Sequence, residues 1–238
     1  MVKAITFDCW DTLLADDPSR NMERKRYFGQ ALVENEITIT GPAIDDLFQR
    51  EADLFREHII KTKKTQGAAE RAQTLIRLAD LELPSSEIGR IAEYGDRVAL
   101  EFGPPLVPGI KEALESLCGT YALAIICNTG WHSGKTVQQL LDECNLTRYF
   151  SHITFSDEAG LAKPHKQIFE YTLKKLGCRP EEAVHIGDSE YSDIVGAKEA
   201  NMKAILFAGI NNRYKDNNTA DVTISTYDHF LEVIENLG

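Results

Sequence analysis

Several short apolar runs of this chain lead into side chains that could do chemistry. The side chains that stand at or soon after these runs are carboxylates, a hydroxyl, an amide and a lysine: Asp8, Thr12, Asn128, Lys163, Asp188 and Asp193. Phosphoryl transfer needs a carboxylate nucleophile, acidic ligands for a hard cation, donors for the phosphoryl oxygens and a cation that balances charge. The set therefore predicts phosphoryl-transfer chemistry, provided that the fold brings its members together.

The apolar runs have the length and composition of strands in a parallel sheet. They occupy residues 4–7, 122–127, 152–155, 183–186, 204–207 and 222–224 and are rich in Ile, Val, Ala or Phe, as strands buried on both faces are. Helical apolar spacing lies between them, at 109–117, 136–145, 166–177 and 191–200. This alternation predicts an α/β fold with a doubly wound parallel sheet. Ligands of such sheets lie outside the carboxyl ends of the strands, where the polar side chains above are expected to meet.

Residues 16–102 interrupt the alternation of strand and helix. Helical spacing recurs there at 22–36, 43–61, 68–79 and 86–102, and no buried strand is evident. The segment ends in a stretch dense in glycine and proline, which cannot continue a helix. We therefore expect an α/β core formed by residues 1–15 and 103–238, with an all-helical domain, 16–102, inserted into it.

Charge and composition restrict the classes of partner. The net charge of −11 argues against a nucleic-acid surface, which is normally basic. The cysteines are scattered and show no metal-ligand spacing, which predicts reduced thiols and a cytoplasmic location. The first apolar run is too short for a signal peptide or a membrane span, so no membrane association is expected. The sequence does not predict an oligomeric state.

The segments FDCWDTLL, ICNTG, GLAKP and HIGDSEYSDIVGAKEA resemble, in order and spacing, the motifs of the haloacid dehalogenase superfamily. The resemblance extends from Ala4 to about Phe207. It implies a hydrolase with a Rossmann-like core. It also implies that the helical insertion between the first and second motifs is a cap domain.

The resemblance also assigns roles to individual residues. It makes Asp8 the nucleophile, which forms an aspartyl intermediate that water then hydrolyses. Thr12 would bond the backbone or the phosphate beside the nucleophile, and Lys163 would pair with Asp8 and the transferring group. Mg²⁺ is the implied cofactor, and its implied ligands are Asp8, the backbone carbonyl of Trp10, Asp188 and Asp193.

The second motif departs from the family pattern, because Cys127 stands where a Ser or Thr usually bonds a phosphoryl oxygen. A thiol is a weaker donor than a hydroxyl. Asn128 and the backbone amides of Thr129 and Gly130 could partly substitute. The alternative is that Cys127 is a small buried strand residue.

The first motif departs at Trp10, which replaces the Asp that protonates the leaving oxygen in the family's phosphatases. An indole cannot shuttle protons, and the neighbouring Asp11 points elsewhere and is a poor substitute. Loss of acid/base catalysis costs about 10²–10⁴ in rate. We therefore expect a preference for phosphoesters with good leaving groups, such as acyl and aryl phosphates.

The sequence predicts a Mg²⁺-dependent phosphatase that acts on a small phosphorylated metabolite. One alternative is a 2-haloacid dehalogenase, because that branch also has an aromatic residue at the position of Trp10. Another is phosphonate cleavage through a Schiff-base lysine in 61–64, and a third is a non-catalytic domain that binds Mg²⁺ and a phosphorylated ligand. Among other residues, we expect His185 in the core and His132 and His165 at the surface. The tail 221–238 is expected to form a strand and a closing helix, with no assigned chemistry.

Overall fold

The computed structural model describes all residues of the chain, 1–238. They form two compact units. The core unit comprises Met1–Asp16, Pro104–Asn128 and Leu141–Gly238, and the helical unit comprises Asp17–Gly103 and Thr129–Leu140. The segment Thr129–Leu140 groups with the helices, although the sequence predicted it in the core. The division into an α/β core of residues 1–15 and 103–238 and an inserted domain of residues 16–102 stays a prediction.

The core unit is built on a sheet of parallel strands in the order β3-β2-β1-β4-β5-β6. This sheet confirms the predicted fold class. The strands are β1 (Ala4–Phe7), β2 (Ala122–Cys127), β3 (His152–Phe155), β4 (Ala183–Gly187), β5 (Lys203–Phe207) and β6 (Val222–Ile224). Every residue of β1 and β4 is buried, as expected for strands covered on both faces.

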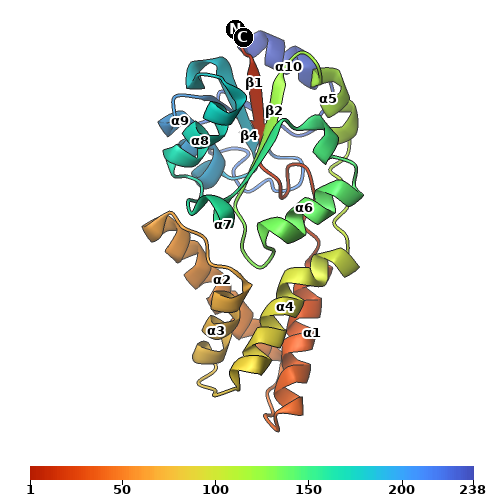
Figure 1. Cartoon of the computed structure of the whole chain (residues 1–238), viewed down its shortest axis with the longest axis vertical. Coiled ribbons are helices and arrows are strands. Elements are labelled where there is room, and N and C mark those ends of the chain that lie inside the picture. Colours follow the sequence, from red (N-terminus) through yellow and green to blue (C-terminus); the bar gives the residue numbers. More distant parts are fainter. The chain divides into compact units, whose positions relative to one another are not determined.

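Helices cover both faces of this sheet (Figure 1). α8 (Lys166–Leu176) and α9 (Gly196–Glu199) pack together on one face, and α5 (Ile110–Leu117) and α10 (Phe230–Leu237) pack together on the other. The remaining helical elements of this unit are the short α7 (Ser156–Ala159) and the turns η1 (Thr147–Tyr149), η2 (Pro180–Glu182) and η3 (Glu190–Val195). The helix α6 (Gly134–Glu143) begins in the helical unit and ends in the core unit. The arrangement is a layered α/β unit.

β1 lies in the middle of the sheet, between β2 and β4. Phe7 at its end is opposite Ile125 of β2 and Ile186 of β4. Its ring is fully buried, with the Phe150 and Phe230 rings at centroid distances of 6.0 and 6.2 Å. The residue that follows Phe7 is therefore fixed between two neighbouring strand ends.

The structure differs from the sequence prediction after β4. The sequence predicted one helix over 191–200, whereas the chain forms the π-helical turn η3 and then the one-turn helix α9. Ser189 begins η3, and its carbonyl accepts hydrogen bonds from the amides of Asp193 and Ile194. Wide turns of this kind occur frequently at functional sites.

The helical unit contains α1 (Pro18–Glu34), α2 (Gly41–Thr62), α3 (Ala68–Leu78) and α4 (Ser85–Glu101). The Asp17 carboxylate caps α1 by accepting from the Ser19 amide, and the Thr40 hydroxyl caps α2 by accepting from the Ala43 amide. An apolar cluster joins the four helices. Trp131 packs in this cluster directly against Gly95 of α4, where a Cβ atom would lie 2.6 Å from the indole ring. That contact explains why 129–140 groups with the helices.

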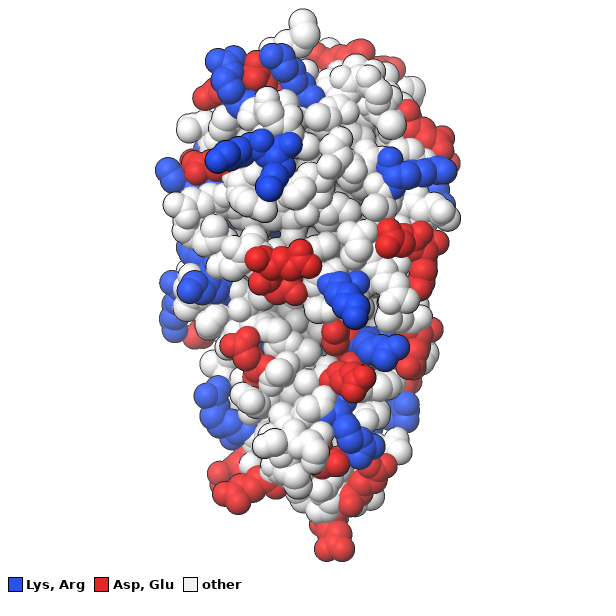
Figure 2. Space-filling view, viewed as in Figure 1, with Lys and Arg blue, Asp and Glu red and all other residues white.

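Acidic and basic side chains are interspersed on the molecular surface shown in Figure 2, without a continuous patch of one sign. No helix combines the length and the apolar character that crossing a bilayer requires.

We predict that breaking the buried ion pair between α2 and α3 destabilises the protein strongly. Arg71 binds Glu51 through two hydrogen bonds of 2.7 and 2.8 Å, and the Glu51 side chain is 2% exposed. Glu51→Ala leaves the Arg71 charge buried, so we expect a loss of about 3–5 kcal/mol in the free energy of unfolding, measured in urea.

The matched control is Glu57→Ala, which removes the exposed pair of Glu57 with Lys61 on the same helix. It should change the free energy of unfolding by less than about 1 kcal/mol. Equal effects of the two substitutions would show that burial does not determine how much the Glu51–Arg71 ion pair contributes to the free energy of unfolding.

Candidate active site

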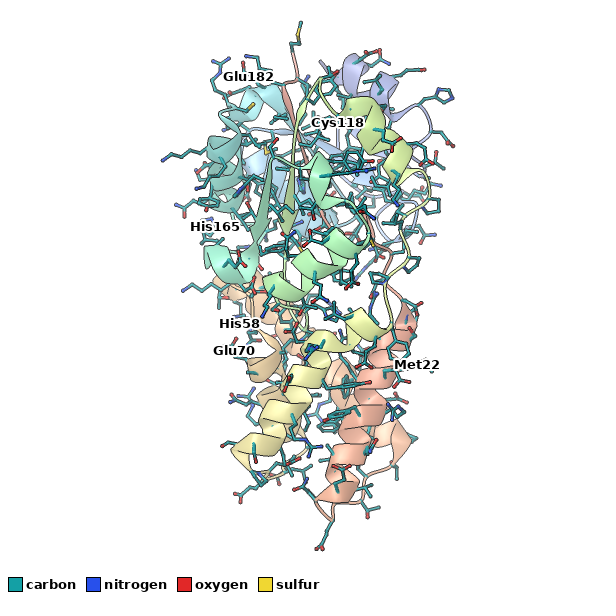
Figure 3. All side chains as sticks on the ribbon, turned by 45° about the vertical axis from the view of Figure 1, so that its right-hand side comes forward. Met22, His58, Glu70, Cys118, His165 and Glu182 are labelled. Carbon is teal, nitrogen blue, oxygen red and sulfur yellow. The ribbon has the colours of Figure 1, made fainter.

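The predicted site residues of the core unit meet at the carboxyl edge of the sheet. Asp8 directly follows β1, and its amide donates to the Ile186 carbonyl of β4 at 2.8 Å. Asn128 directly follows β2, and Asp188 directly follows β4. Figure 3 shows His165 beyond the carboxyl end of the sheet and Glu182 at the amino end, which marks the two opposite edges.

Lys163 connects the two carboxylates at the centre of this edge. Its ammonium lies 2.5 Å from Oδ1 of Asp8 and 2.6 Å from Oδ1 of Asp193. The Lys163 and Asp193 side chains are 1% exposed, and that of Asp8 is 10% exposed. A buried ammonium between two carboxylates lowers the cost of removing these charges from water. The geometry brings together three residues that are far apart in the sequence.

Asn128 holds the backbone of Lys163. Its side-chain amide donates to the Lys163 carbonyl at 2.9 Å, and its side-chain oxygen accepts from the Lys163 amide at 2.8 Å. Both ends of the Asn128 side chain are therefore engaged with the backbone. This arrangement makes Asn128 a residue that positions Lys163. The amide nitrogen carries a second hydrogen, and donation to a phosphoryl oxygen stays a prediction.

The Asp193 carboxylate is fixed from several sides. Its Oδ2 accepts from the Ser189 amide at 3.0 Å, and its Oδ1 lies 3.2 Å from Nε2 of His185. A Cβ atom on Gly187 would lie 2.3 Å from the Asp193 carboxyl carbon, so only glycine fits at that position. His185 is fully buried and contacts Thr6 through its other ring nitrogen at 2.8 Å. His185 thus lies in the core, where it orients Asp193.

The acidic residues of this edge have the chemistry of a site for a hard divalent cation. Carboxylate oxygens of Asp8, Asp188 and Asp193 all lie within 4.8 Å of one another. Asn211, in the loop after β5, donates a hydrogen bond to Oδ2 of Asp188 at 2.7 Å. A carboxylate that binds a metal is typically oriented by such a neighbour. Asn211 was not predicted as a site residue, although it also follows a strand.

The residues of the acidic cluster shift one another's pKa values. Burial, followed by the repulsion of Asp193, raises the pKa of Asp8 to about 7 against the opposing effect of Lys163. Burial and the charges of Asp8 and Asp193 raise the pKa of Asp188 well above its usual range. Burial acts in the same direction on Asp193, but Lys163 and His185 outweigh it and lower its pKa. A cation at this position would relieve the repulsion that raises the first two pKa values.

The loop after Asp8 contains a buried hydroxyl, that of Thr12, without a hydrogen-bond partner. Oγ1 of Thr12 is buried and has no hydrogen-bond partner, and a buried polar group of this kind is costly without a ligand or water. Trp10 is half-buried in the same loop, and its backbone pairs with Leu14. The Asp11 carboxylate accepts from the Asp16 amide at 2.7 Å. Asp11 is thus engaged as a turn cap.

Cys127 is a fully buried strand residue. Its thiol donates weakly to the Asn128 carbonyl at 3.7 Å and forms a side-chain hydrogen bond with the fully buried Cys9. The hydrogen bond with Cys127, followed by burial, raises the pKa of Cys9 well above its usual value. Of the two interpretations of Cys127, the structure favours a small packed residue.

The expectation of surface placement is wrong for His132. This residue is 8% exposed in the helical unit, where Arg24 contacts its Nε2 at 2.5 Å. Burial and the nearby Arg24 charge lower the pKa of His132 to about 3, so its ring is neutral. His165 is half-buried and caps α8, accepting from the Gln167 amide. No local signal in the sequence indicates the burial of His132, because its partners Arg24 and Asp96 lie in the helices α1 and α4.

Comparisons with known proteins agree with the geometry. The chain matches the protein family described as haloacid dehalogenase-like hydrolase over residues 2–201. A glyceraldehyde 3-phosphate phosphatase of Pyrococcus furiosus is 30% identical over 98% of this chain and 93% of that protein. One from Methanocaldococcus jannaschii is 33% identical over 100% of this chain and 99% of that protein. A phosphoglycolate phosphatase of Salmonella typhimurium is 26% identical over 100% of this chain and 93% of that protein.

Solved structures share the fold at lower identity. A 2-haloacid dehalogenase from Pseudomonas syringae pv. Tomato superposes with a TM-score of 0.73 at 22% identity, over 100% of both chains. The putative hydrolase YfnB from Bacillus subtilis, solved bound to magnesium, superposes with a TM-score of 0.72 at 20% identity, over 98% of both chains.

We predict that Asp8→Asn stabilises the metal-free protein at alkaline pH. The folded-state pKa of Asp8, about 7, lies above its usual 3.8, so the folded chain carries a disfavoured buried carboxylate above pH 7. Asparagine resembles the protonated form. The melting temperature in EDTA should therefore rise most above pH 7, and the gain should shrink as the pH falls toward 4.

The control is Asp216→Asn at an exposed loop position. It should not alter the melting temperature either above pH 7 or near pH 4. A lower melting temperature for Asp8→Asn at pH 8 would mean that attraction to Lys163 outweighs burial and repulsion.

Proposed function

The chain belongs to the haloacid dehalogenase-like hydrolase family, and on that premise we propose that it is a Mg²⁺-dependent phosphatase of a small phosphorylated metabolite. The observation that carries the proposal is the contact of Lys163 with both Asp8 and Asp193 beside a third acid, Asp188. A nucleophile, a charge-balancing cation and ligands for a hard metal ion are the parts that phosphoryl transfer uses.

The relatives support a phosphorylated substrate. Proteins that are 30% and 33% identical over nearly the whole chain are named glyceraldehyde 3-phosphate phosphatase, and a more distant one is named phosphoglycolate phosphatase. Such names suggest a small phosphoester as the substrate of this chain. We further propose that residues 16–102 are the inserted cap domain expected from the sequence.

The acidic cluster fits Mg²⁺. Asp8, Asp188 and Asp193 would hold it, together with the backbone carbonyl of Trp10. The bound ion would neutralise the negative charge of the phosphoryl oxygens and of the cluster itself. A protein of the same fold, YfnB, has been solved bound to magnesium, which supports this assignment.

Each core residue has a defined part in the proposed reaction. A carboxylate oxygen of Asp8 attacks phosphorus, the bond from phosphorus to the leaving oxygen breaks, and that oxygen departs with the electron pair. Lys163 balances the charge of Asp8 during the attack, and Asn128 holds Lys163 in place. The buried Thr12 hydroxyl is available to donate to a phosphoryl oxygen. Water then attacks the phosphorus of the aspartyl phosphate, and the bond from phosphorus to the Asp8 oxygen breaks with its electron pair on Asp8. The released phosphate and solvent take up the proton of the water, and the Asp8 carboxylate is restored.

Trp10 restricts the kinds of leaving group that the proposed reaction can use. The position two residues after Asp8 carries an indole, and the Asp11 carboxylate is engaged with the Asp16 amide. Neither side chain supplies a proton to the leaving oxygen. The proposed substrates are therefore phosphoesters whose leaving group departs without protonation, such as acyl or aryl phosphates.

We predict Mg²⁺-dependent hydrolysis of p-nitrophenyl phosphate by the intact chain. Asp8→Asn removes the nucleophile and should lower kcat by about 10³-fold or more, which also controls for contaminating phosphatases. Addition of EDTA should abolish the activity. Halide release from a 2-haloacid without metal, and no phosphate release, would instead support a dehalogenase. Absence of both reactions would support a non-catalytic binding domain.

We also predict a strong dependence of the rate on the leaving group. An aryl phosphate should have a higher kcat/KM than an alkyl phosphate by about 10²-fold or more, because no side chain protonates the leaving alkoxide. Trp10→Asp should narrow this ratio by raising the rate with the alkyl ester. Equal kcat/KM values for the two esters with the unaltered chain would contradict the role given to Trp10.

A further inference from the structure

Tyr227 connects the C-terminal segment with the loop that follows Asp8. It lies after β6, in the tail to which the sequence analysis assigned no chemistry. Its hydroxyl donates to the backbone carbonyl of Thr12 at 2.9 Å, across 215 positions of the sequence. The residue is 4% exposed. A buried hydrogen bond thus ties the end of the chain to the loop of the proposed nucleophile.

The surrounding aromatic residues fix the direction of the Tyr227 hydroxyl. The ring stacks on Phe207, with centroids 4.7 Å apart and an interplanar angle of 14°. Phe230 meets it edge-on at 5.3 Å and 89°. On another side, a Cβ atom on Gly109 would come within 3.3 Å of the Tyr227 Cβ. A side chain confined in this way presents its hydroxyl in one position.

The loop that receives this hydrogen bond has an unusual backbone. Asp11 adopts a left-handed conformation with φ 55°. The amides of Leu13 and Leu14 donate back to the Cys9 carbonyl, so the chain turns sharply around Thr12. The carbonyl of Thr12 lies beside its own unpartnered hydroxyl in this turn. Loss of the Tyr227 hydrogen bond would leave a buried carbonyl without its donor.

We propose that Tyr227 is a positioning residue, whose hydrogen bond to Thr12 holds the loop 8–14 in the conformation that aims Asp8 and the Thr12 hydroxyl at the reacting phosphoryl group. The proposal rests on the function proposed above. Burial and the nearby Asp8 charge raise the pKa of Tyr227 well above its usual value. The phenol therefore stays protonated and remains a donor at physiological pH.

The test is Tyr227→Phe, which keeps the aromatic ring in its stack and removes the hydroxyl. A displacement of reacting groups by about 1 Å can cost roughly 100-fold in rate. We expect kcat for p-nitrophenyl phosphate with Mg²⁺ to fall by about 10- to 100-fold, while KM changes by less than about twofold.

The matched control is Tyr149→Phe. Tyr149 is also a nearly buried tyrosine of the core unit, at 9% exposure. Its hydroxyl donates to Glu115 at 2.9 Å and accepts from Arg148 at 2.6 Å, and neither partner belongs to the loop 8–14. This variant loses a comparable hydroxyl, so a general effect of removing a tyrosine hydroxyl would appear in both. We expect its kcat to equal that of the unaltered chain.

A second measurement is independent of activity. Amide hydrogen exchange reports local opening, and we expect faster exchange of residues 8–14 in Tyr227→Phe than in Tyr149→Phe, at a temperature where both are folded. Unchanged kcat in an active Tyr227→Phe variant overturns the proposal, as does unchanged exchange of 8–14. If the unaltered chain hydrolyses no phosphoester, the proposed function fails, and the exchange experiment still decides whether Tyr227 holds the loop.

Discussion

The core unit depends on one buried electrostatic arrangement, in which the Lys163 ammonium lies between the carboxylates of Asp8 and Asp193. Removing three charges from water is costly, and mutual attraction offsets that cost only when the geometry is held closely. Much of the surrounding structure serves this requirement. Asn128 fixes the Lys163 backbone, His185 and Ser189 hold Asp193, and Gly187 leaves the space that Asp193 occupies. The sheet edge therefore behaves as a single unit, in which the loss of the Lys163 ammonium would leave two buried carboxylates uncompensated.

The sequence predicted the sheet and the meeting of its polar residues because both follow from local patterns. Each strand is a short apolar run, and parallel strands place whatever follows them at a common edge. Asp8, Asn128 and Asp188 could be placed there from these two facts alone, and the structure puts them there. The resemblance to the haloacid dehalogenase family was recognisable from the same segments. Helix ends were also predicted to within a few residues, since caps and glycine or proline residues are local signals.

The sequence could not predict which groups each side chain contacts, because these contacts join segments that are distant in the sequence. Nothing near Asn128 in the sequence shows that its amide binds the backbone of Lys163 instead of a ligand. The two interpretations of Cys127, as a phosphate donor or as a packed residue, depend on its contact with Cys9, which follows the neighbouring strand β1. His132 and the segment Thr129–Leu140 belong with helices that precede them by many residues. The π-helical turn at Glu190–Val195 has the same apolar spacing as an ordinary helix, so periodicity could not distinguish the two.

The position of β1 in the sheet has a consequence for the growing chain on the ribosome. β1 emerges before its partners, yet one of its neighbours, β4, begins only at Ala183. At a translation rate of about 5–20 residues per second, the nascent strand waits about 10–35 seconds for that neighbour, and until then one of its two edges has no partner strand. The helices from Pro18 to Glu101 are complete long before then. Asp8 is thus translated well before Lys163 and Asp193, the two residues that complete its surroundings.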